Sequence, residues 1–362
     1  MYVQWVEFVN FRSYLLLTYH PAPAVNVLVG SNAQGKTNLL EGLSVLLSGR
    51  SFRTPRAHEI PLWGATCARV SGTVRKGEID RRLKWAASFE APGAWRVVSD
   101  GCPWARVVAF GWQDLAILNG SPQARRNFLD AFTGKLYPSH LSVASRYRQI
   151  LARRNHLLQA GRRDAEAASR LAPWDEQLST VGAELLYRRR QAVDVLQREL
   201  SCLFPELAGR GLVRLVYQAS VPGDGDSAAI LDAIRRRRGE EMARGQSLVG
   251  PHRDDLRIDL DGVDMRVYGS RGQQRLLALV LRLAEVFPVS AALGSPPVLL
   301  LDDALSELDP VVQAAVTRWV GGVGQVFLTT ADPTIQPSGA ACWEVEGGTV
   351  EGPIVECVKG AA

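Results

Sequence analysis

One eight-residue segment constrains the fold of this chain more than any other. Residues 30–37 read GSNAQGKT and match the pattern G-x-x-x-x-G-K-[ST] at every specified position. The segment follows a short apolar run at residues 25–29 and precedes a stretch whose leucines share one helical stripe. A buried strand, a glycine-rich loop and an amphipathic helix in this order predict an α/β fold that binds the phosphates of a nucleoside triphosphate.

The residue types in this loop fit phosphate chemistry. Glycines let the backbone wrap tightly so that consecutive N–H groups point at one phosphate, and the helix start adds a positive dipole end. Lys36 is expected to reach the β- and γ-phosphates of the nucleotide, and the Thr37 hydroxyl is expected to ligate Mg²⁺. A chance glycine-rich turn is the alternative. The candidate nucleotide-binding residues are Gly30, Asn32, Gly35, Lys36, Thr37 and Asn38.

A second apolar run ends in two carboxylates. Residues 298–301 read VLLL, and Asp302 and Asp303 follow directly. A buried strand would place this acidic pair at its carboxyl end, beside the glycine-rich loop. Asp302 is then expected in the Mg²⁺ shell, and Asp303 is expected to polarise the attacking water. An acidic turn at the end of a core strand is the alternative.

A third element precedes a long apolar helix. Residues 268–275, YGSRGQQR, resemble the Ser-x-Gly-Gln signature of ABC ATPases, in which Ser270, Gly272 and Gln273 would present donors to a γ-phosphate. Such a signature completes the site of a second subunit, so ATP would join two protomers. A capped helix start with Ser as N-cap is the alternative. Residues 302–309, which end at Asp309, resemble the D-loop that crosses such a dimer interface.

The chain between these motifs predicts the domain organisation. Lys36 and Ser270 are 234 residues apart, farther than in transporter ATPases, yet the gap is too short for the coiled-coil arms of SMC proteins. Residues 123–203 carry a helical pattern, with a turn expected at 160–173, whereas strand patterns return at 212–221, 256–267 and 325–358. We expect an ABC/SMC-type P-loop ATPase head with mixed β sheets, at residues 1–122 and 206–362, interrupted by a compact helical domain at 123–205.

Composition bears on the compartment. The chain is 46% apolar and 22% charged, its start resembles neither a signal nor a transit peptide, and no run approaches the ~20 apolar residues of a membrane span. The five cysteines form no CxxC pair, which argues against a zinc site and a disulfide framework. These features predict a cytoplasmic protein without a membrane partner.

Arginine dominates the basic residues. Of 42 basic side chains only five are lysines, and the net charge is +5. Genomic base composition explains such a bias, and so does recognition of phosphate, which Arg binds bidentately. Residues 146–198 contain eleven arginines and six acids, so this block alone matches the excess of the whole chain. This block predicts a basic surface that binds phosphate groups, and a solvated helix face is the alternative. The candidates are Arg53, Arg56, Arg188, Arg189 and Arg190, followed by Arg125, Arg126 and Arg235 to Arg238.

Longer strings resemble one family over essentially the whole chain. The most specific are residues 250–255, GPHRDD, and residues 121–130, which read SPQARRNFLD. The chain is similar in these strings to the RecF family of bacterial recombination-mediator ATPases. That resemblance implies an ATP-dependent homodimer that binds double-stranded and gapped DNA and works with RecR and RecO to help load RecA. It also implies slow, DNA-stimulated ATP hydrolysis.

The sequence departs from the family pattern at several positions. Asp303 replaces the Glu of most ABC ATPases, which is compatible with slow turnover, and Ala33 replaces a frequent Gly, which we expect to be harmless. The usual switch histidine is absent, and Thr330 or Asp332 is the candidate substitute. Gln113 is the candidate contact to Mg²⁺ or the attacking water.

The sequence also carries one expectation about residue roles and leaves two alternative functions. His252 and Arg253 are expected to brace the ATPase core rather than to take part in catalysis. An ABC ATPase subunit of a transporter is the main alternative function, and the long gap between the motifs argues against it. A P-loop kinase or metabolite enzyme is a second alternative, and the signature element, which needs a second subunit, argues against that.

Overall fold

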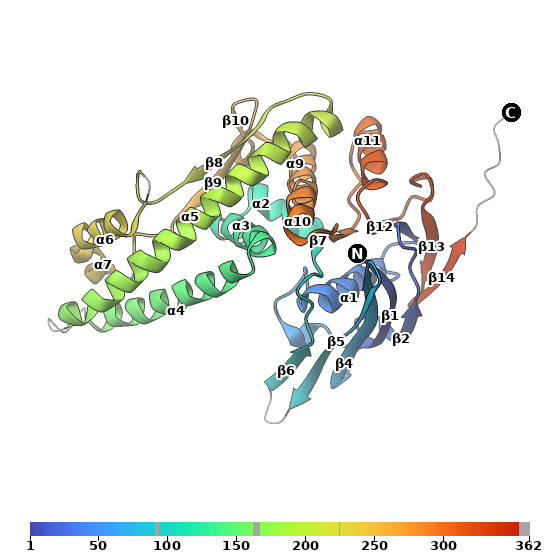
Figure 1. Cartoon of the computed structure of the whole chain (residues 1–362), viewed down its shortest axis with the longest axis horizontal. Coiled ribbons are helices and arrows are strands. Elements are labelled where there is room, and N and C mark those ends of the chain that lie inside the picture. Colours follow the sequence, from blue (N-terminus) through green and yellow to red (C-terminus); the bar gives the residue numbers. More distant parts are fainter. Residues whose placement is uncertain (91–93, 162–166, 224, 355–362) are drawn as a thin grey trace. The chain divides into compact units, whose positions relative to one another are not determined.

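The structure is a computed structural model that describes residues 1–90, 94–161, 167–223 and 225–354 (Figure 1). Internal contacts divide the chain into two units. The head unit comprises Met1–Asp114, Glu206–Gly209 and Leu279–Ala362, and the helical unit comprises Leu115–Pro205 and Arg210–Ala278. Each unit therefore draws on segments that are far apart in the sequence.

A six-stranded sheet carries the motifs of the head unit. Its order is β14-β13-β3-β12-β11-β7, and every pairing is parallel except that of β13 with β14. The central strands read as continuous apolar runs because both of their faces are covered. The strands are β3 (Val25–Val29), β7 (Val107–Phe110), β11 (Val298–Leu301), β12 (Val326–Thr330), β13 (Ala341–Glu346) and β14 (Thr349–Ile354).

A second, antiparallel sheet of the head unit has the order β2-β1-β4-β5-β6. Helix α1 (Lys36–Ser48) contacts strands of both sheets, so it lies between them, and six of its apolar side chains are buried there. The close approach needs Gly42, where a Cβ atom would lie 2.4 Å from the Phe8 ring. The strands are β1 (Tyr2–Phe11), β2 (Tyr14–Tyr19), β4 (Cys67–Lys76), β5 (Ile79–Glu90) and β6 (Ala94–Ser99).

Short helices complete the head unit. They are η1 (Ala57–Glu59), η2 (Trp112–Leu115), α10 (Val286–Leu293) and α11 (Pro310–Val320). The last part of α9 (Arg271–Leu283) also belongs to this unit, where Arg282 pairs with Asp114.

The helical unit is built on two long helices that run side by side in Figure 1. Helix α4 (Ser139–Ala160) and helix α5 (Ala167–Ala208) are joined by the buried Arg154–Asp175 ion pair and by the bond from Arg188 to Ser139. The other elements are α2 (Ala116–Asn119), α3 (Pro122–Leu136), β8 (Val213–Gln218), α6 (Ser227–Arg236), α7 (Arg238–Arg244), β9 (Asp255–Leu260), β10 (Val263–Asp264) and α8 (Met265–Tyr268). Strands β8 to β10 form one antiparallel sheet.

The observed elements depart from the sequence expectations at three places. Residues 210–278 group with the helices rather than with the head, because β9 packs against α3. The domain boundaries predicted at residues 122 and 205 remain a prediction. The strand expected at 256–267 ends early, since α8 begins at Met265. The turn expected at 160–173 falls partly on residues 162–166, which lie outside the described residues, as do residues 355–358 of the predicted last strand.

One helical stretch, Arg271–Leu293, is long and apolar enough to cross a membrane by length and composition alone. The expectation of no such run overlooked it because Arg282 and Glu285 interrupt the apolar residues. Within this stretch, 61% of the apolar window is buried inside the structure. A core helix passes the same test, so the stretch is weak evidence for a membrane segment.

Candidate nucleotide-binding site

The glycine-rich loop connects β3 to α1 as predicted. Gly35 has a φ of 112°, which favours glycine, and its carbonyl accepts a hydrogen bond of 3.0 Å from the Tyr14 hydroxyl. Gly30 has no room for a side chain, because a Cβ atom there would lie 2.3 Å from the carbonyl oxygen of Val345 on β13. Both glycines are therefore required by the fold of the loop, before any ligand is considered.

Lys36 and Thr37 begin helix α1. Lys36 is buried, and its Nζ donates to the carbonyls of Gly30 and Ser31 at 2.5 and 2.8 Å. Burial lowers the pKa of the Lys36 ammonium, while the carboxylates of Asp303 and Asp302 raise it. The cation therefore lies inside the loop and within the electrostatic reach of the acidic pair.

Asp302 lies where the sequence predicts it, at the carboxyl end of β11. Its Oδ1 accepts hydrogen bonds from the Thr37 hydroxyl at 2.8 Å and from the Thr329 hydroxyl at 3.0 Å. Asp302 is 8% exposed, and its burial raises the pKa of the carboxyl. Two residues 265 positions apart in the sequence thus meet at hydrogen-bond distance.

Thr329 is the residue that sequence reasoning missed in this region. It lies one position before Thr330, the last residue of β12, whose hydroxyl accepts a hydrogen bond from the backbone N–H of Asp332 at 2.9 Å. Strand register supplies the missing signal, since Leu301 pairs with Leu328 and the next residues along are Asp302 and Thr329. The Thr329 hydroxyl also accepts from the backbone N–H of Asp303 at 2.9 Å.

Asp303 has an unusual backbone conformation. Its φ is 50°, in the left-handed region that Asp tolerates better than most residues. The side chain is exposed, and its Oδ2 accepts from the Ser306 hydroxyl at 2.7 Å. Further along the same loop, Asp309 caps α11 by accepting from the backbone N–H of Val311. The loop therefore presents the Asp303 carboxylate to solvent in a defined position.

Gln113 follows β7, the strand that pairs with β11 on its other side. The backbone N–H of Asp302 donates to the Phe110 carbonyl at 2.9 Å, which brings the ends of these two strands together. Gln113 Oε1 is buried and has no hydrogen-bond partner among the described residues. An orphaned oxygen of this kind suits a bound cation or water.

These oxygens fit a magnesium ion. The Thr37 hydroxyl, the Asp302 carboxylate and the Gln113 amide are all hard oxygen donors, and Mg²⁺ in phosphate sites usually takes one or two carboxylates plus phosphate oxygens. The described residues contain no group of three or more His, Cys, Asp or Glu side chains that could hold a metal. The donor set thus suits a cation that arrives with phosphate.

The signature residues lie in the helical unit, at the start of α9. Ser270 and Gln273 form a reciprocal capping box: the Ser270 N–H donates to Gln273 Oε1 at 2.9 Å, and the Gln273 N–H donates to Ser270 Oγ at 3.3 Å. Ser270, Gly272 and Gln273 are all exposed. A Cβ atom on Gly272 would meet nothing within 4 Å, so the chain itself does not require glycine there.

Asn38 and Arg53 are tied to a buried carboxylate beside the loop. Arg53 donates to Asn38 at 2.9 Å and pairs with Glu41 at 3.2 Å, and Asn38 donates to Ser13 at 2.9 Å. Arg12, which sequence reasoning did not select, pairs with the same Glu41 at 2.6 Å. Asn32 is exposed on the loop. Arg53 therefore belongs to the surroundings of the phosphate loop.

The other arginine candidates differ in exposure. Arg189 is a correction: it is buried, it pairs with Asp130 at 2.8 Å and it donates to the Pro251 carbonyl, so it cannot present its guanidinium to DNA. Arg188 is partly exposed and pairs with Glu184, and Arg190 donates to the Gly223 carbonyl. Arg56 is exposed and pairs with Glu59.

The GPHRDD string braces the helical unit rather than the ATPase head. His252 Nδ1 lies 2.8 Å from the Tyr147 hydroxyl, and Nε2 lies 3.1 Å from the Ser247 carbonyl. Burial lowers the pKa of His252 to about 4, and neighbouring arginines add to this effect. All three residues belong to the helical unit, so the expected bracing role falls on a different unit from the predicted one.

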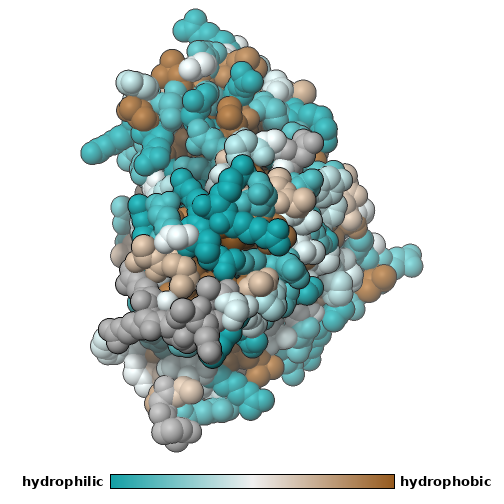
Figure 2. Space-filling view, turned by 90° about the vertical axis from the view of Figure 1, so that its left-hand side faces the viewer, coloured by the Kyte–Doolittle hydropathy of each residue, from teal (hydrophilic) through white to brown (hydrophobic). Residues whose placement is uncertain are grey.

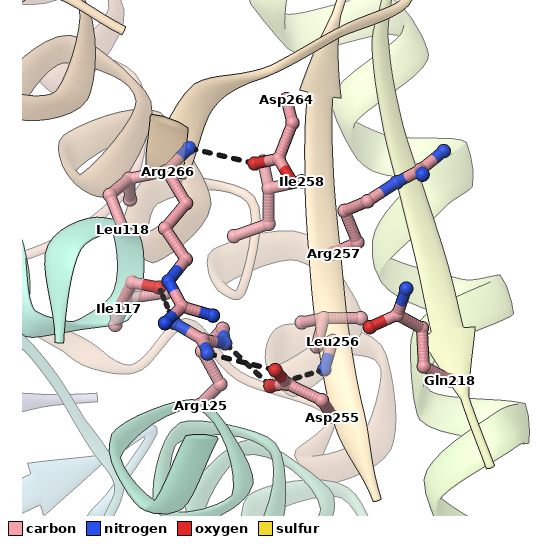
Figure 3. A pocket seen from close by; sticks show the side chains of 10 residues that line it. All are labelled: Ile117, Leu118, Arg125, Gln218, Asp255, Leu256, Arg257, Ile258, Asp264 and Arg266. Atoms are coloured by element: carbon pink, nitrogen blue, oxygen red, sulfur yellow. Dashed lines mark hydrogen bonds and ion pairs between the residues drawn. The ribbon is translucent and has the colours of Figure 1, made fainter. Parts of the chain in front are cut away.

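A small pocket lies next to α8 in the helical unit (Figure 3). Its volume is about 60 Å³, which is enough for a water molecule and too small for a nucleotide. Arg125 and Asp255 form an ion pair in its wall, with Arg125 Nε 2.6 Å from Asp255 Oδ1. Figure 3 shows Arg266 extending toward the same pair. Arg125 is therefore structural, because its guanidinium is buried and neutralised.

Comparison with known proteins assigns the chain to a family. No family model matches it. The DNA replication and repair protein RecF of Lactobacillus delbrueckii subsp. bulgaricus is 36% identical over 347 residues, which cover 92% of this chain and 91% of that protein. The chain belongs to the RecF family.

Solved structures agree with this assignment. A structure of the recombination mediator protein RecF-ATP in the RecFOR pathway matches with a TM-score of 0.86 and 27% identity, and the match covers 97% of both chains. The SMC head domain of Pyrococcus furiosus with its coiled coil matches with a TM-score of 0.56 and 16% identity over 97% of this chain and 95% of that one. The predicted ABC/SMC-type α/β fold is confirmed.

Proposed function

We propose that this RecF-family chain is an ATP-driven DNA-binding switch of recombinational repair. The observation that carries the proposal is the 2.8 Å bond between Thr37 of the phosphate loop and the buried Asp302. Phosphate-binding and acidic motifs meet in P-loop ATPases in this way, because Mg²⁺ must contact both the protein and the phosphates. The structure of the relative RecF-ATP supports ATP as the nucleotide.

The side chains of the head unit have distinct roles in this proposal. The backbone of residues 30–37 and the Lys36 ammonium bind the phosphates, while Thr37, Asp302 and Gln113 hold the cation. When bound, Mg²⁺ neutralises the charge that develops on the phosphate oxygens. Asp303 orients the attacking water and accepts its proton, and its short side chain is consistent with slow turnover.

Dimerisation is the second part of the proposal. The exposed Ser270, Gly272 and Gln273 bind the γ-phosphate held by a second copy of the chain, and Asp309 lies in the loop that crosses the interface. The capping box supports this role because it fixes the Ser270 side chain before the partner arrives. ATP then stabilises the dimer over the monomer, and hydrolysis releases it.

DNA is the partner that this cycle serves. We propose that the dimer binds double-stranded or gapped DNA, interacts with RecR and thereby helps RecO load RecA. Among the arginines selected from sequence, the exposed Arg56 and the partly exposed Arg188 and Arg190 remain candidates for phosphate contacts. The net charge of +5 supports a salt-dependent contribution.

The deciding experiment measures the ATPase rate with and without gapped duplex DNA. The wild type should hydrolyse ATP slowly and faster with DNA, and Lys36→Met should lose ATP binding. Asp303→Asn should bind ATP, hydrolyse it at least tenfold more slowly and accumulate as a dimer in sedimentation. The proposal is contradicted, and the transporter alternative favoured, if the ATPase rate is the same with and without DNA and DNA binding does not depend on salt.

A further inference from the structure

Helix α4 carries charge of one sign on its exposed side. Its 22 residues include four arginines and no Asp or Glu. Arg154 is buried, but Arg146, Arg148 and Arg153 are exposed, and within the described part of the chain none of these three forms an ion pair. The positions 146, 149, 153 and 156 recur at the spacing of one helical face and hold Arg, Gln, Arg and His.

The acidic residues behind this face are already neutralised. Asp175 and Glu241 both pair with the buried Arg154, and Asp175 also pairs with Arg238. Asp175 is 2% exposed and Glu241 is fully buried. The exposed arginines of α4 therefore keep their positive potential toward solvent, where it attracts phosphate.

A hollow with an aromatic wall lies at the carboxyl end of the same face. Its volume is about 430 Å³, and its lining residues are Ala152, Arg153, His156, Leu157 and Trp174. The Arg153 guanidinium lies 5.5 Å from the centre of the Trp174 ring. Figure 2 looks onto this end of the helical unit, where most of the visible surface is hydrophilic and apolar residues occur in separate small patches.

We propose that single-stranded DNA binds along α4, with one unstacked nucleobase in this hollow against Trp174. Arg146 and Arg148, which lie toward opposite edges of the exposed side of α4, contact the phosphates, and Arg153 and His156 contact the base or its phosphate. The inference rests on the proposed DNA binding and adds the strand type, the helix and the aromatic contact. It also moves the predicted basic surface from Arg188–Arg190 on α5 to the unpaired arginines of α4.

The chemistry of the hollow favours a base over the other occupants. An apolar wall next to an indole suits the flat face of a base, and such stacking is the common mode of single-strand binding. A paired base inside a duplex cannot enter, because both of its faces are covered by its neighbours. An acidic peptide would satisfy the arginines but would leave the aromatic wall without a specific role.

Two substitutions separate the base contact from the phosphate contacts. Trp174→Leu removes the stacking surface and should weaken binding of a (dT)₁₅ oligonucleotide about tenfold, with duplex affinity unchanged. The double variant Arg146→Gln/Arg148→Gln should weaken binding to all DNA and reduce the salt dependence by about one to two units of slope. Trp63→Leu, at a fully exposed tryptophan of the head unit, and Arg244→Gln, at an exposed arginine of α7 that pairs with Glu240, are matched controls without effect.

An abasic oligonucleotide tests the same contact without changing the protein. The wild type should bind a 15-mer of abasic sites about tenfold more weakly than (dT)₁₅, whereas Trp174→Leu should bind the two equally. Equal wild-type affinity for both oligonucleotides overturns the base contact, even if Trp174→Leu fails to fold. Duplex binding that persists in that case leaves the proposed function intact, whereas loss of all DNA binding by the wild type removes both proposals.

Discussion

At the scale of single residues, backbone conformation determines which amino acids fit the phosphate loop. Gly30 and Gly35 are required by a close strand and by a positive φ, and these are the glycines that the sequence motif demands. Ala33 is different, because its φ is 67° although it carries a Cβ atom. A left-handed conformation costs an L-residue roughly 1–2 kcal/mol, so the expectation that Ala33 is harmless stays a prediction that a stability measurement can test.

Ala33→Gly tests this cost. Relief of the left-handed strain outweighs the greater entropy of glycine in the unfolded chain, so the free energy of unfolding should rise by about 0.5–1 kcal/mol. The opposite kind of change at a nearby position, Gly35→Ala, should lower the free energy of unfolding by more than 1 kcal/mol. A Cβ atom at Gly35 would also lie 2.9 Å from the Tyr14 hydroxyl. Urea denaturation of the three proteins measures both effects, and a destabilised Ala33→Gly variant contradicts the strain argument.

At the scale of single elements, buried ion pairs hold the helical unit together. Asp130 of α3 accepts from Arg189 of α5 and lies 3.0 Å from His140 of α4, so one carboxylate joins three helices. These contacts hold the pKa of Asp130 at about 2 against the opposing effect of burial. The apolar spacing of α5 predicted its helix, whereas nothing in the local sequence distinguishes the buried Arg189 from the more exposed Arg188 and Arg190.

Substitution of these neighbouring arginines should separate stability from DNA binding. Arg189→Gln leaves Asp130 without its bidentate partner and should lower the free energy of unfolding by about 3 kcal/mol. Arg188→Gln removes a partly exposed pair with Glu184 and should cost less than 1 kcal/mol. Thermal unfolding of both variants measures the difference. Equal melting temperatures would show that Arg189 contributes no more to stability than Arg188 does.

The loop before β9 should make stability depend on pH. The folded-state pKa of His252 is about 4, below the ordinary value of 6.5, so the unfolded chain takes up a proton first as the pH falls. The stabilising contribution is present above pH 6.5 and is lost on the way down to pH 4, by about 2 kcal/mol between pH 7 and pH 5. Asp130 titrates below this window and does not contribute to it.

His252→Gln provides the comparison for this pH effect. Glutamine keeps hydrogen-bonding groups toward Tyr147 and Ser247 but does not titrate, so the loss between pH 7 and pH 5 should shrink by about 2 kcal/mol. Guanidinium denaturation at the two pH values gives the free energies. Parallel pH profiles for the two proteins would assign the dependence to other groups.

At the scale of the whole molecule, sequence and structure supply different information. The ordered motifs predicted the strand–loop–helix unit and the position of Asp302, because local patterns determine both. Thr329 and the orphaned oxygen of Gln113 became visible only once the parallel register of β7, β11 and β12 was known. Long-range register follows from packing of the whole sheet, so a single sequence could not supply it.

The open space around Gly272 leads to a prediction about assembly. Since a Cβ atom there meets nothing within 4 Å, Gly272→Ala should not lower the stability of the monomer and should raise it by up to about 1 kcal/mol through helix propensity. If a second copy brings its ATP against this backbone, the same methyl group must clash with it. ATP-dependent dimerisation should therefore weaken at least tenfold, and Ser270→Arg should abolish it while ATP binding persists.

Sedimentation velocity with and without ATP distinguishes these outcomes, with Val267→Ala as the matched control, since Val267 is exposed on α8 but lies outside the Ser-x-Gly-Gln element. A dimer of unchanged affinity in both Gly272→Ala and Ser270→Arg would remove the signature from the interface. The capping box of Ser270 and Gln273 would then be no more than a helix start. If the predicted pattern is found, glycine at position 272 is not needed for the fold of one chain but is needed for the ATP-dependent contact between two chains.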